Sequence, residues 1–379
     1  MRVTEEYSYC RNCGNLVRCE DCFCKHCGIS VNTKHKTTEG NQSVFDRIND
    51  YVGNTGSKEL NWKALFSDVF KSHSSEEAES IFICGTKATT PPLSQVTSTW
   101  PKPWLYSRVF LVFAIAFFLL KICWGCFNNV NVIPGLILVG AFTVPLTTLI
   151  MFMELNAFRN ISLYNIMRIF FIGGCASLVV TLFLFSTFLS PAEGNPTFIN
   201  ACIIGFVEEL AKAIVVYFIM KHLFDCKYIL NALLIGTAVG AGFAAFESAG
   251  YAFIVLLNGL ASEYQVDAVG AMMDNIYMRG FMAPGGHITW AAISAVALLM
   301  AKGRGSLESN IFTQKQFWKI FIIPVACHAL WDMPLGIGQE VYLQYWLLLA
   351  AIWVVVLIFV NMGLNEVKQI NSNNYENLY

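Results

Sequence analysis

Long apolar runs dominate the chain from residue 105 onward, and short polar connections separate them. Each run has about 20 residues or more, which is the length that crosses the hydrocarbon core of a bilayer as a helix. The pattern predicts about eight spanning helices, at roughly 105–127, 132–153, 166–190, 197–220, 229–257, 281–301, 316–335 and 341–362. The expected fold class is an all-α polytopic membrane bundle.

Residues 1–100 follow a different pattern. The stretches 44–52 and 60–70 place apolar residues at helical spacing, which predicts amphipathic helices on the bilayer surface or docked on the N-terminal segment. Residues 74–99 are polar and predict a linker that contains a short strand-like piece at 81–83.

The composition agrees with a membrane protein. Hydrophobic residues make up 55% of the chain and charged residues 13%, whereas a soluble protein has ~25% charged residues. The formal net charge of −1 is uninformative about partners. We expect no nucleic-acid partner, and the lipid bilayer is the expected surrounding.

Positive charges alternate between the predicted connections. Lysine and arginine gather in the even-numbered connections, and the odd-numbered ones hold almost none, with Arg279 as the main exception. Because cytoplasmic loops carry the excess of positive charge, the pattern predicts a multi-pass protein of the cell membrane with cytoplasmic N- and C-termini.

Cysteines are concentrated near the N-terminus in Cys-x-x-Cys pairs. Cys19 and Cys22 form one pair, and two further pairs are each followed by glycine, a spacing that suits tetrahedral zinc and resembles the zinc-ribbon family. The favoured ligands of a structural Zn²⁺ are the four cysteines of those two pairs: Cys10, Cys13, Cys24 and Cys27. A disulfide framework is the alternative, but it needs an oxidising compartment. A ribbon of this size is expected to bind a protein partner or to regulate.

The predicted organisation therefore has four parts. Residues 1–30 form a zinc ribbon, residues 31–100 a cytoplasmic amphipathic and linker region, residues 101–365 the transmembrane domain, and residues 366–379 a polar C-terminal tail.

Three charged residues lie within the apolar run at 198–220: Glu208, Glu209 and Lys212. A charge at this depth costs several kcal/mol unless it is paired or faces water. On a helix, Lys212 neighbours both glutamates, at i+4 and i+3, and it can neutralise only one of them. A structural ion pair is one interpretation, and acid–base chemistry at the uncompensated carboxylate is the other.

Further titratable residues occur in later spans. Measured from the outer end of each span at ~1.5 Å per residue, Glu208 and Glu247 lie at a depth of ~15–16 Å, and His287 and His328 at ~9–10 Å. Asp332 follows His328 by one helical turn. These residues are expected to meet in one hydrated pocket in the outer half of the bilayer.

As a set, these residues resemble the PrsW intramembrane protease family, a relative of the CAAX prenyl endopeptidases and bacteriocin-processing proteases. The resemblance covers about residues 100–362, and its motifs, in order, are Glu208-Glu209-x-x-Lys212, Phe243-x-x-x-Glu247, His287 and His328-x-x-x-Asp332. The CAAX pattern has histidine at the position of Glu247, and Lys212 replaces an arginine one residue further on.

The resemblance implies proteolysis with a glutamate-activated water. Glu208 is the expected general base, alone or with Glu247 or His287, while Glu209 pairs with Lys212. His328 and Asp332 are expected to stabilise the oxyanion. The metalloprotease alternative places zinc on Glu247, His287 and His328, with Glu208 as the base.

The implied substrate is a membrane-anchored protein, such as an anti-sigma factor, cut near the extracytoplasmic side. Two other classes remain open at this stage. Intramembrane glutamate, histidine and lysine also suit a proton-coupled transporter, and a non-catalytic scaffold could use the ribbon for assembly.

Overall fold

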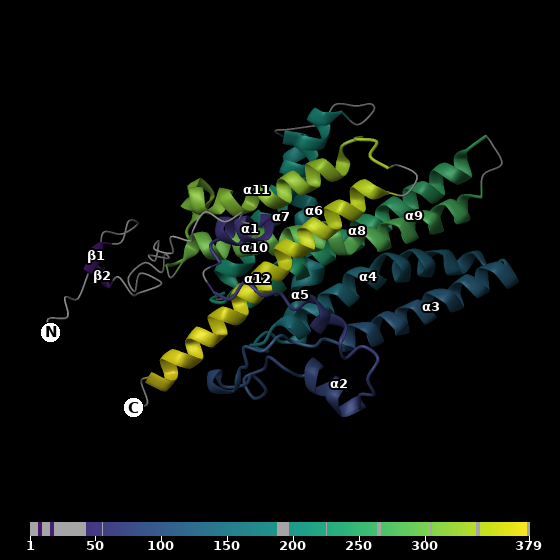
Figure 1. The fold of residues 1–379 in the computed structure, drawn as a ribbon. Helices are drawn as coiled ribbons and strands as arrows, with labels where there is room; N and C mark the ends of the chain where they lie inside the picture. The colour runs from purple at the N-terminus through teal and green to yellow at the C-terminus, as the bar shows by residue number, and fades with distance from the viewer. Residues whose placement is uncertain are drawn as a thin grey trace, which may run out of the picture.

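The computed structural model describes residues 7–9, 16–18, 43–54, 56–187, 197–224, 226–263, 267–303, 305–338 and 342–376. Within these residues the protein is a bundle of long helices (Figure 1). The only sheet in these ranges has two antiparallel strands, β1 (Tyr7–Tyr9) and β2 (Leu16–Arg18). The four predicted zinc ligands lie outside the described residues.

The segment before the first membrane helix is partly helical. It contains α1 (Val44–Val52), the 3₁₀ turns η1 (Trp62–Phe66) and η2 (Leu93–Gln95), and α2 (Ser75–Phe82). The amphipathic helix expected at 44–52 is confirmed, whereas the 60–70 stretch forms only the short turn η1.

The strand-like piece expected at 81–83 is wrong, because α2 extends through Phe82. A capping box starts this helix: the Ser74 side chain accepts from the Glu77 N–H, and the Glu77 carboxylate accepts from the Ser74 N–H. This local signal outweighs the β preference of the isoleucines.

The membrane part consists of helices in sequence. They are α3 (Leu105–Phe127), η3 (Val130–Val132), α4 (Ile133–Leu155), α5 (Leu163–Arg168), the π-turn η4 (Ile169–Gly173), α6 (Gly174–Thr187), α7 (Phe198–His222), α8 (Ile229–Ala261), α9 (Ala268–Met282), η5 (Ala283–Gly285), α10 (His287–Lys302), η6 (Ser309–Thr313), α11 (Lys315–Asp332) and α12 (Leu343–Glu376).

Six stretches of the described chain are long and apolar enough to cross a membrane. They are 105–127, 130–155, 163–187, 229–261, 268–302 and 343–372, and they match six of the about eight predicted spans. The two other predicted spans correspond to α7, which contains four charged residues, and α11, which contains three. The chain is therefore a multi-pass membrane protein.

The connection predicted before the sixth span is largely helical instead of a loop. Helix α8 continues to Ala261, and α9 returns along it from Ala268 to Met282 before the 3₁₀ turn η5 leads into α10. Arg279, which the positive-charge pattern placed in an outer loop, therefore lies in the last turn of α9.

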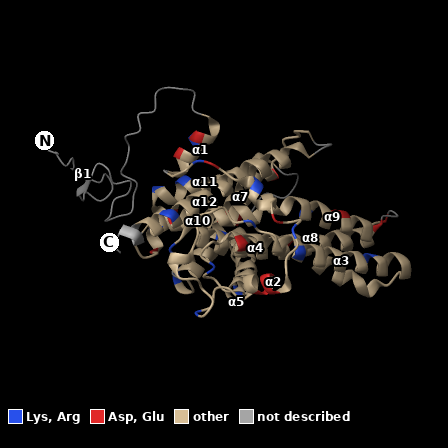
Figure 2. Ribbon diagram, turned by 60° about the horizontal axis from the view of Figure 1, so that its bottom comes forward, with Lys and Arg blue, Asp and Glu red and all other residues tan. Residues whose placement is uncertain are grey.

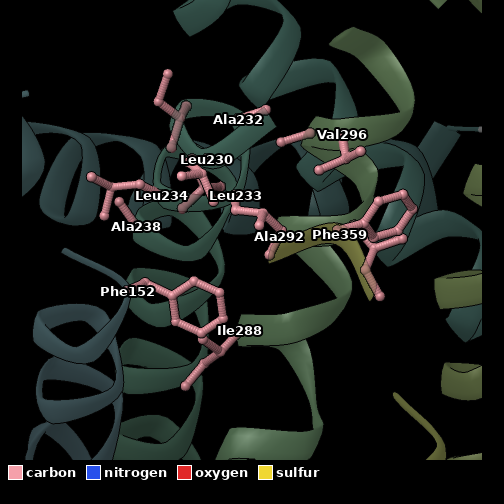
Figure 3. Close-up of a cluster of buried hydrophobic side chains, with 14 of the residues drawn as sticks. Phe152, Leu230, Ala232, Leu233, Leu234, Ala238, Ile288, Ala292, Val296 and Phe359 are labelled. Atoms are coloured by element: carbon pink, nitrogen blue, oxygen red, sulfur yellow. The ribbon is translucent and has the colours of Figure 1, made fainter. Parts of the chain in front are cut away.

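Helix α8 is the centre of the bundle. It contacts α4, α6, α7, α9, α10 and α12 as well as η4. Figure 3 shows part of the resulting core, in which side chains of α8 meet residues of α4, α10 and α12. The labelled residues there are Leu230, Ala232, Leu233, Leu234 and Ala238 of α8, with Phe152, Ile288, Ala292, Val296 and Phe359 from the other helices.

Glycines let the helices around α8 approach at backbone distance. A Cβ on Gly236 would overlap the carbonyl oxygen of Ala291, and a Cβ on Gly240 would overlap that of His287. The spacing is Gly-x-x-x-Gly, which presents both positions on one helix face. This contact fixes the first turn of α10, and with it His287, against α8.

Helix α3 lies at the edge of the bundle and buries only Leu105. Its first turn is held by Glu154 of α4, whose carboxylate accepts from the N–H groups of Trp104, Leu105 and Tyr106 at 2.8, 2.9 and 3.0 Å. Figure 2 shows that α3, α4 and α8 carry few charged residues along their lengths, as lipid contact and core packing require.

We expect Gly240→Ala to destabilise the protein by about 1–3 kcal/mol, because the new methyl group must push α10 away from α8. Thermal unfolding of the purified protein in detergent micelles measures this loss. The matched control is Gly250→Ala on the same helix, where a Cβ meets nothing within 4 Å. Equal unfolding temperatures for the two variants would contradict the close contact.

Candidate active site

Helix α7 carries two carboxylates and one ammonium group into the bundle. The Lys212 Nζ lies 2.7 Å from Glu209 Oε1 and 3.9 Å from Glu208 Oε2. The side chains of Lys212 and Glu209 have no exposed surface, and that of Glu208 is 11% exposed. Lys212 thus neutralises Glu209, which confirms the predicted ion pair, and Glu208 is the more accessible carboxylate.

His328 reaches the same place from α11. Its Nδ1 lies 2.8 Å from Glu209 Oε1, and its Nε2 lies 3.9 Å from Glu208 Oε2 and 3.4 Å from Asp332 Oδ2. Gly205 of α7 allows this arrangement, because a Cβ there would press on the backbone of α11 at Ala329.

His287 is the first residue of α10 and faces His328 across the site. Its Nδ1 accepts a hydrogen bond of 2.8 Å from Lys212 Nζ and lies 3.9 Å from Glu208 Oε2. Its Nε2 lies 3.0 Å from Glu247 Oε2 of α8. Arg279 in turn pairs with Glu247 and donates from Nε to the Ser248 hydroxyl at 2.9 Å.

The two imidazoles are therefore oriented in the same manner. In each ring one nitrogen faces a carboxylate that holds its proton: Glu247 for His287 and Glu209 for His328. The other nitrogen of each ring lies 3.9 Å from Oε2 of Glu208. That oxygen is buried and has no hydrogen-bond partner within the described chain. Three atoms that could bind a metal ion thus converge: Oε2 of Glu208, Nδ1 of His287 and Nε2 of His328.

Aromatic rings enclose the cluster. The Lys212 Nζ lies 4.3 Å from the ring centroid of Phe243, and the Trp290 ring stacks on His328 with centroids 4.4 Å apart. The His287 ring packs between Phe243 and Trp290. Such apolar walls exclude water and strengthen the electrostatic interactions inside.

All seven predicted site residues lie in this one connected cluster. They are Glu208, Glu209 and Lys212 from α7, Glu247 from α8, His287 from α10, and His328 and Asp332 from α11. Four helices therefore contribute to one site, as the estimated depths predicted.

Within the described part of the chain, one set of side chains is grouped closely enough to hold a metal ion. The ligand atoms of Glu208, His287 and His328 all lie within 4.8 Å of one another. The sequence-based alternative had proposed Glu247 as the third ligand, with Glu208 as the base. In the structure the Glu247 carboxylate instead pairs with the Arg279 guanidinium and with Nε2 of His287.

Sequence reasoning missed the parts played by Arg279 and Trp290. Arg279 gave one signal, as the exception to the charge pattern of the outer connections. No comparable signal marked Trp290, because a single tryptophan in an apolar run is usual in a membrane helix.

A buried group of carboxylates and imidazoles within a multi-pass bundle has the side chains that an intramembrane hydrolase uses. The family comparison gives the same class: the model of the PrsW family of intramembrane metalloproteases matches residues 162–361. This match covers just over half of the chain and includes all seven site residues, and the chain belongs to this family. It is accordingly a membrane peptidase. Comparisons with curated proteins and with solved structures gave no significant match.

We expect Lys212→Met to destabilise the protein by about 3–5 kcal/mol, because it leaves the buried Glu209 carboxylate without its cation. Chemical unfolding in micelles measures the change. Lys221→Met removes an exposed lysine from the same helix and serves as the control. The double variant Lys212→Met/Glu209→Leu should recover part of the loss, and an additive result would contradict the pairing.

Proposed function

We propose that this protein hydrolyses a peptide bond of a membrane-anchored protein near the extracytoplasmic side of the bilayer. The observation that carries the proposal is the unpartnered oxygen of Glu208, which faces one nitrogen of His287 and one of His328. A carboxylate and two imidazoles that converge without satisfying one another provide a place for an activated water.

The residues present fit a metal ion such as zinc. Two imidazoles and one carboxylate are the donor set of many zinc peptidases, in which a fourth position stays open for water. Metal-bound histidines also give their other nitrogen to a carboxylate or carbonyl, and Glu247 and Glu209 take that position here. Zinc bound at Glu208, His287 and His328 would replace the hydrogen bond from Lys212 at Nδ1 of His287. It would supply an activated water and polarise the scissile carbonyl.

The direct-base mechanism uses the same carboxylate. In that form Oε2 of Glu208 takes the proton of the attacking water, and His328 with Asp332 stabilises the oxyanion. We favour the metal form, because one nitrogen of each imidazole faces Glu208 and the other nitrogen faces a second carboxylate.

The surrounding residues position this centre in both forms. Glu209 holds the proton at Nδ1 of His328, and Glu247 holds the proton at Nε2 of His287. Lys212 and Arg279 balance the charges of these two carboxylates. Asp332 is the most exposed carboxylate of the cluster, with 29% of its side chain accessible, and it is placed to exchange a proton on the substrate side.

The proposed topology has eight spans, including α7 and α11, with both termini in the cytoplasm of a cell-membrane protein. The alternation of positive charges supports it. His287 begins α10 and Asp332 ends α11, whereas Lys302 and Lys315 lie at the opposite ends of these helices. The site then lies in the outer half of the membrane, within reach of a single-pass substrate such as an anti-sigma factor.

A structural zinc in an N-terminal ribbon is a further part of the proposal. The spacing of Cys10, Cys13, Cys24 and Cys27 supports it. In the proposed topology the ribbon faces the cytoplasm, opposite the peptidase site, so we assign it to partner binding or regulation.

We expect Glu208→Gln to lower substrate cleavage by about 10²–10⁴-fold, because the amide is a poor metal ligand and a poor base. Quantitative proteomics of membranes that contain the wild type or the variant measures this as loss of single-pass proteins cut just outside the bilayer. Glu366→Gln is the control, since Glu366 is a glutamate of α12 that accepts from the Ile229 N–H at the start of α8. Wild-type cleavage by Glu208→Gln would remove Glu208 from the mechanism.

We expect the purified protein to hold two zinc ions per chain, measured by elemental analysis. Glu208→Gln/His287→Ala should remove one, and Cys10→Ser/Cys27→Ser the other, because each pair belongs to a different ligand set. Cys19→Ser/Cys22→Ser is the control for the ribbon and should leave both. Chelation should abolish cleavage, and full activity without the intramembrane metal would instead assign Glu208 as the direct base.

A further inference from the structure

A cavity of about 310 Å³ opens beside the catalytic cluster. Residues of α8, α9, α10, α11 and the start of α12 line it, and two of them, His287 and Trp290, also form the wall of the cluster. We propose that this cavity is a specificity pocket, which receives a large apolar side chain of the substrate next to the scissile bond. The inference rests on the proposed function.

The position of the pocket limits which substrate residue can occupy it. His287 lines the pocket, and its Nδ1 lies 3.9 Å from Glu208 Oε2. The pocket and the reacting centre are thus separated by about one imidazole ring. Since an extended chain advances ~3.3–3.6 Å per residue, the side chain in the pocket belongs to a residue within two positions of the cleaved bond.

The walls of the pocket favour an apolar occupant. Met278, Met282, Trp331 and Tyr345 contribute thioether and ring surfaces, and such surfaces adapt to large apolar side chains. The rings pack against one another: the Trp331 ring centroid lies 4.7 Å from that of Tyr345 and 5.7 Å from that of Trp290.

The one charged group in the wall is already satisfied. The Arg279 guanidinium pairs with Glu247, donates to Ser248 and stacks over the ring of Tyr251 at 4.5 Å. It therefore offers no uncompensated charge to a substrate, and a charged side chain in the pocket would lose its hydration without gaining a partner.

Two polar atoms of pocket-lining residues lack partners of a kind that a peptide backbone could supply. The amide oxygen of Asn275 and the indole N–H of Trp290 are buried and have no hydrogen-bond partner within the described chain, and both residues line the pocket. One is an acceptor and the other a donor. The backbone of a substrate offers both complementary groups, whereas the acyl chain of a lipid offers neither.

The test uses the full-length protein in lipid vesicles with a library of single-span peptides, randomised in their outer juxtamembrane region. Mass spectrometry of the products gives the sequence around each cut. For the wild type we expect one position within two residues of the cut to be enriched in Phe, Leu, Met and Trp. Absence of cleavage by the wild type would overturn the proposed function and this inference with it.

Two variants change the volume of the pocket in opposite directions. Ala283→Phe fills it and should shift the preference at that position toward Ala, Ser and Gly by at least about tenfold in kcat/KM, and Tyr345→Ala enlarges it and should favour Trp. Ala350→Trp is the matched control, on the exposed face of α12 and outside the lining. Asn275→Leu should raise KM about fivefold, the effect of one lost hydrogen bond.

The outcomes separate this inference from the proposed function. An unchanged preference in both Ala283→Phe and Tyr345→Ala, with cleavage retained, would overturn the pocket and leave the peptidase intact. A rate that follows the acyl-chain length of the vesicle lipid, with no preferred side chain, would assign the cavity to lipid and also overturn the inference.

Discussion

The ion pair between the Lys212 ammonium and the Glu209 carboxylate is the interaction on which the site depends. Both groups are completely buried at the depth of an apolar bundle, where an unpaired charge would be very costly. The pair also orients its neighbours, because Lys212 donates to His287 and Glu209 accepts from His328. One buried pair thus connects helices α7, α10 and α11 and leaves the adjacent Glu208 as the free carboxylate.

Close backbone packing makes this network possible. Gly236 and Gly240 bring α10 against α8, and Gly205 brings α11 against α7. In lipid, such contacts between small residues replace the hydrophobic driving force that holds soluble helices together. The stability of the bundle and the geometry of the site therefore have the same origin, and a change in helix spacing acts on both.

The site combines fully buried groups with partly exposed ones. Glu209 and Lys212 have no accessible surface, whereas Glu208, Glu247 and Asp332 become progressively more exposed, at 11%, 15% and 29%. His287 and Trp290 also line the adjacent pocket. In the proposed mechanism, a peptide substrate contacts the more exposed Asp332 and the pocket, and the buried ion pair does not touch it.

The sequence by itself determined six of the spans, the Glu209–Lys212 pair and the seven residues that meet, because length, apolar runs and helical spacing are local properties. It predicted a loop at 258–280, where α9 instead packs along α8 as a helical hairpin. It predicted a strand-like piece at 81–83, where a capping box starts helix α2 instead. Only the tertiary structure decided that Glu208, and not Glu247, joins the two histidines, and that Arg279 neutralises Glu247. These are contacts between different helices, and the rotation of each helix about its axis is set by packing against its neighbours.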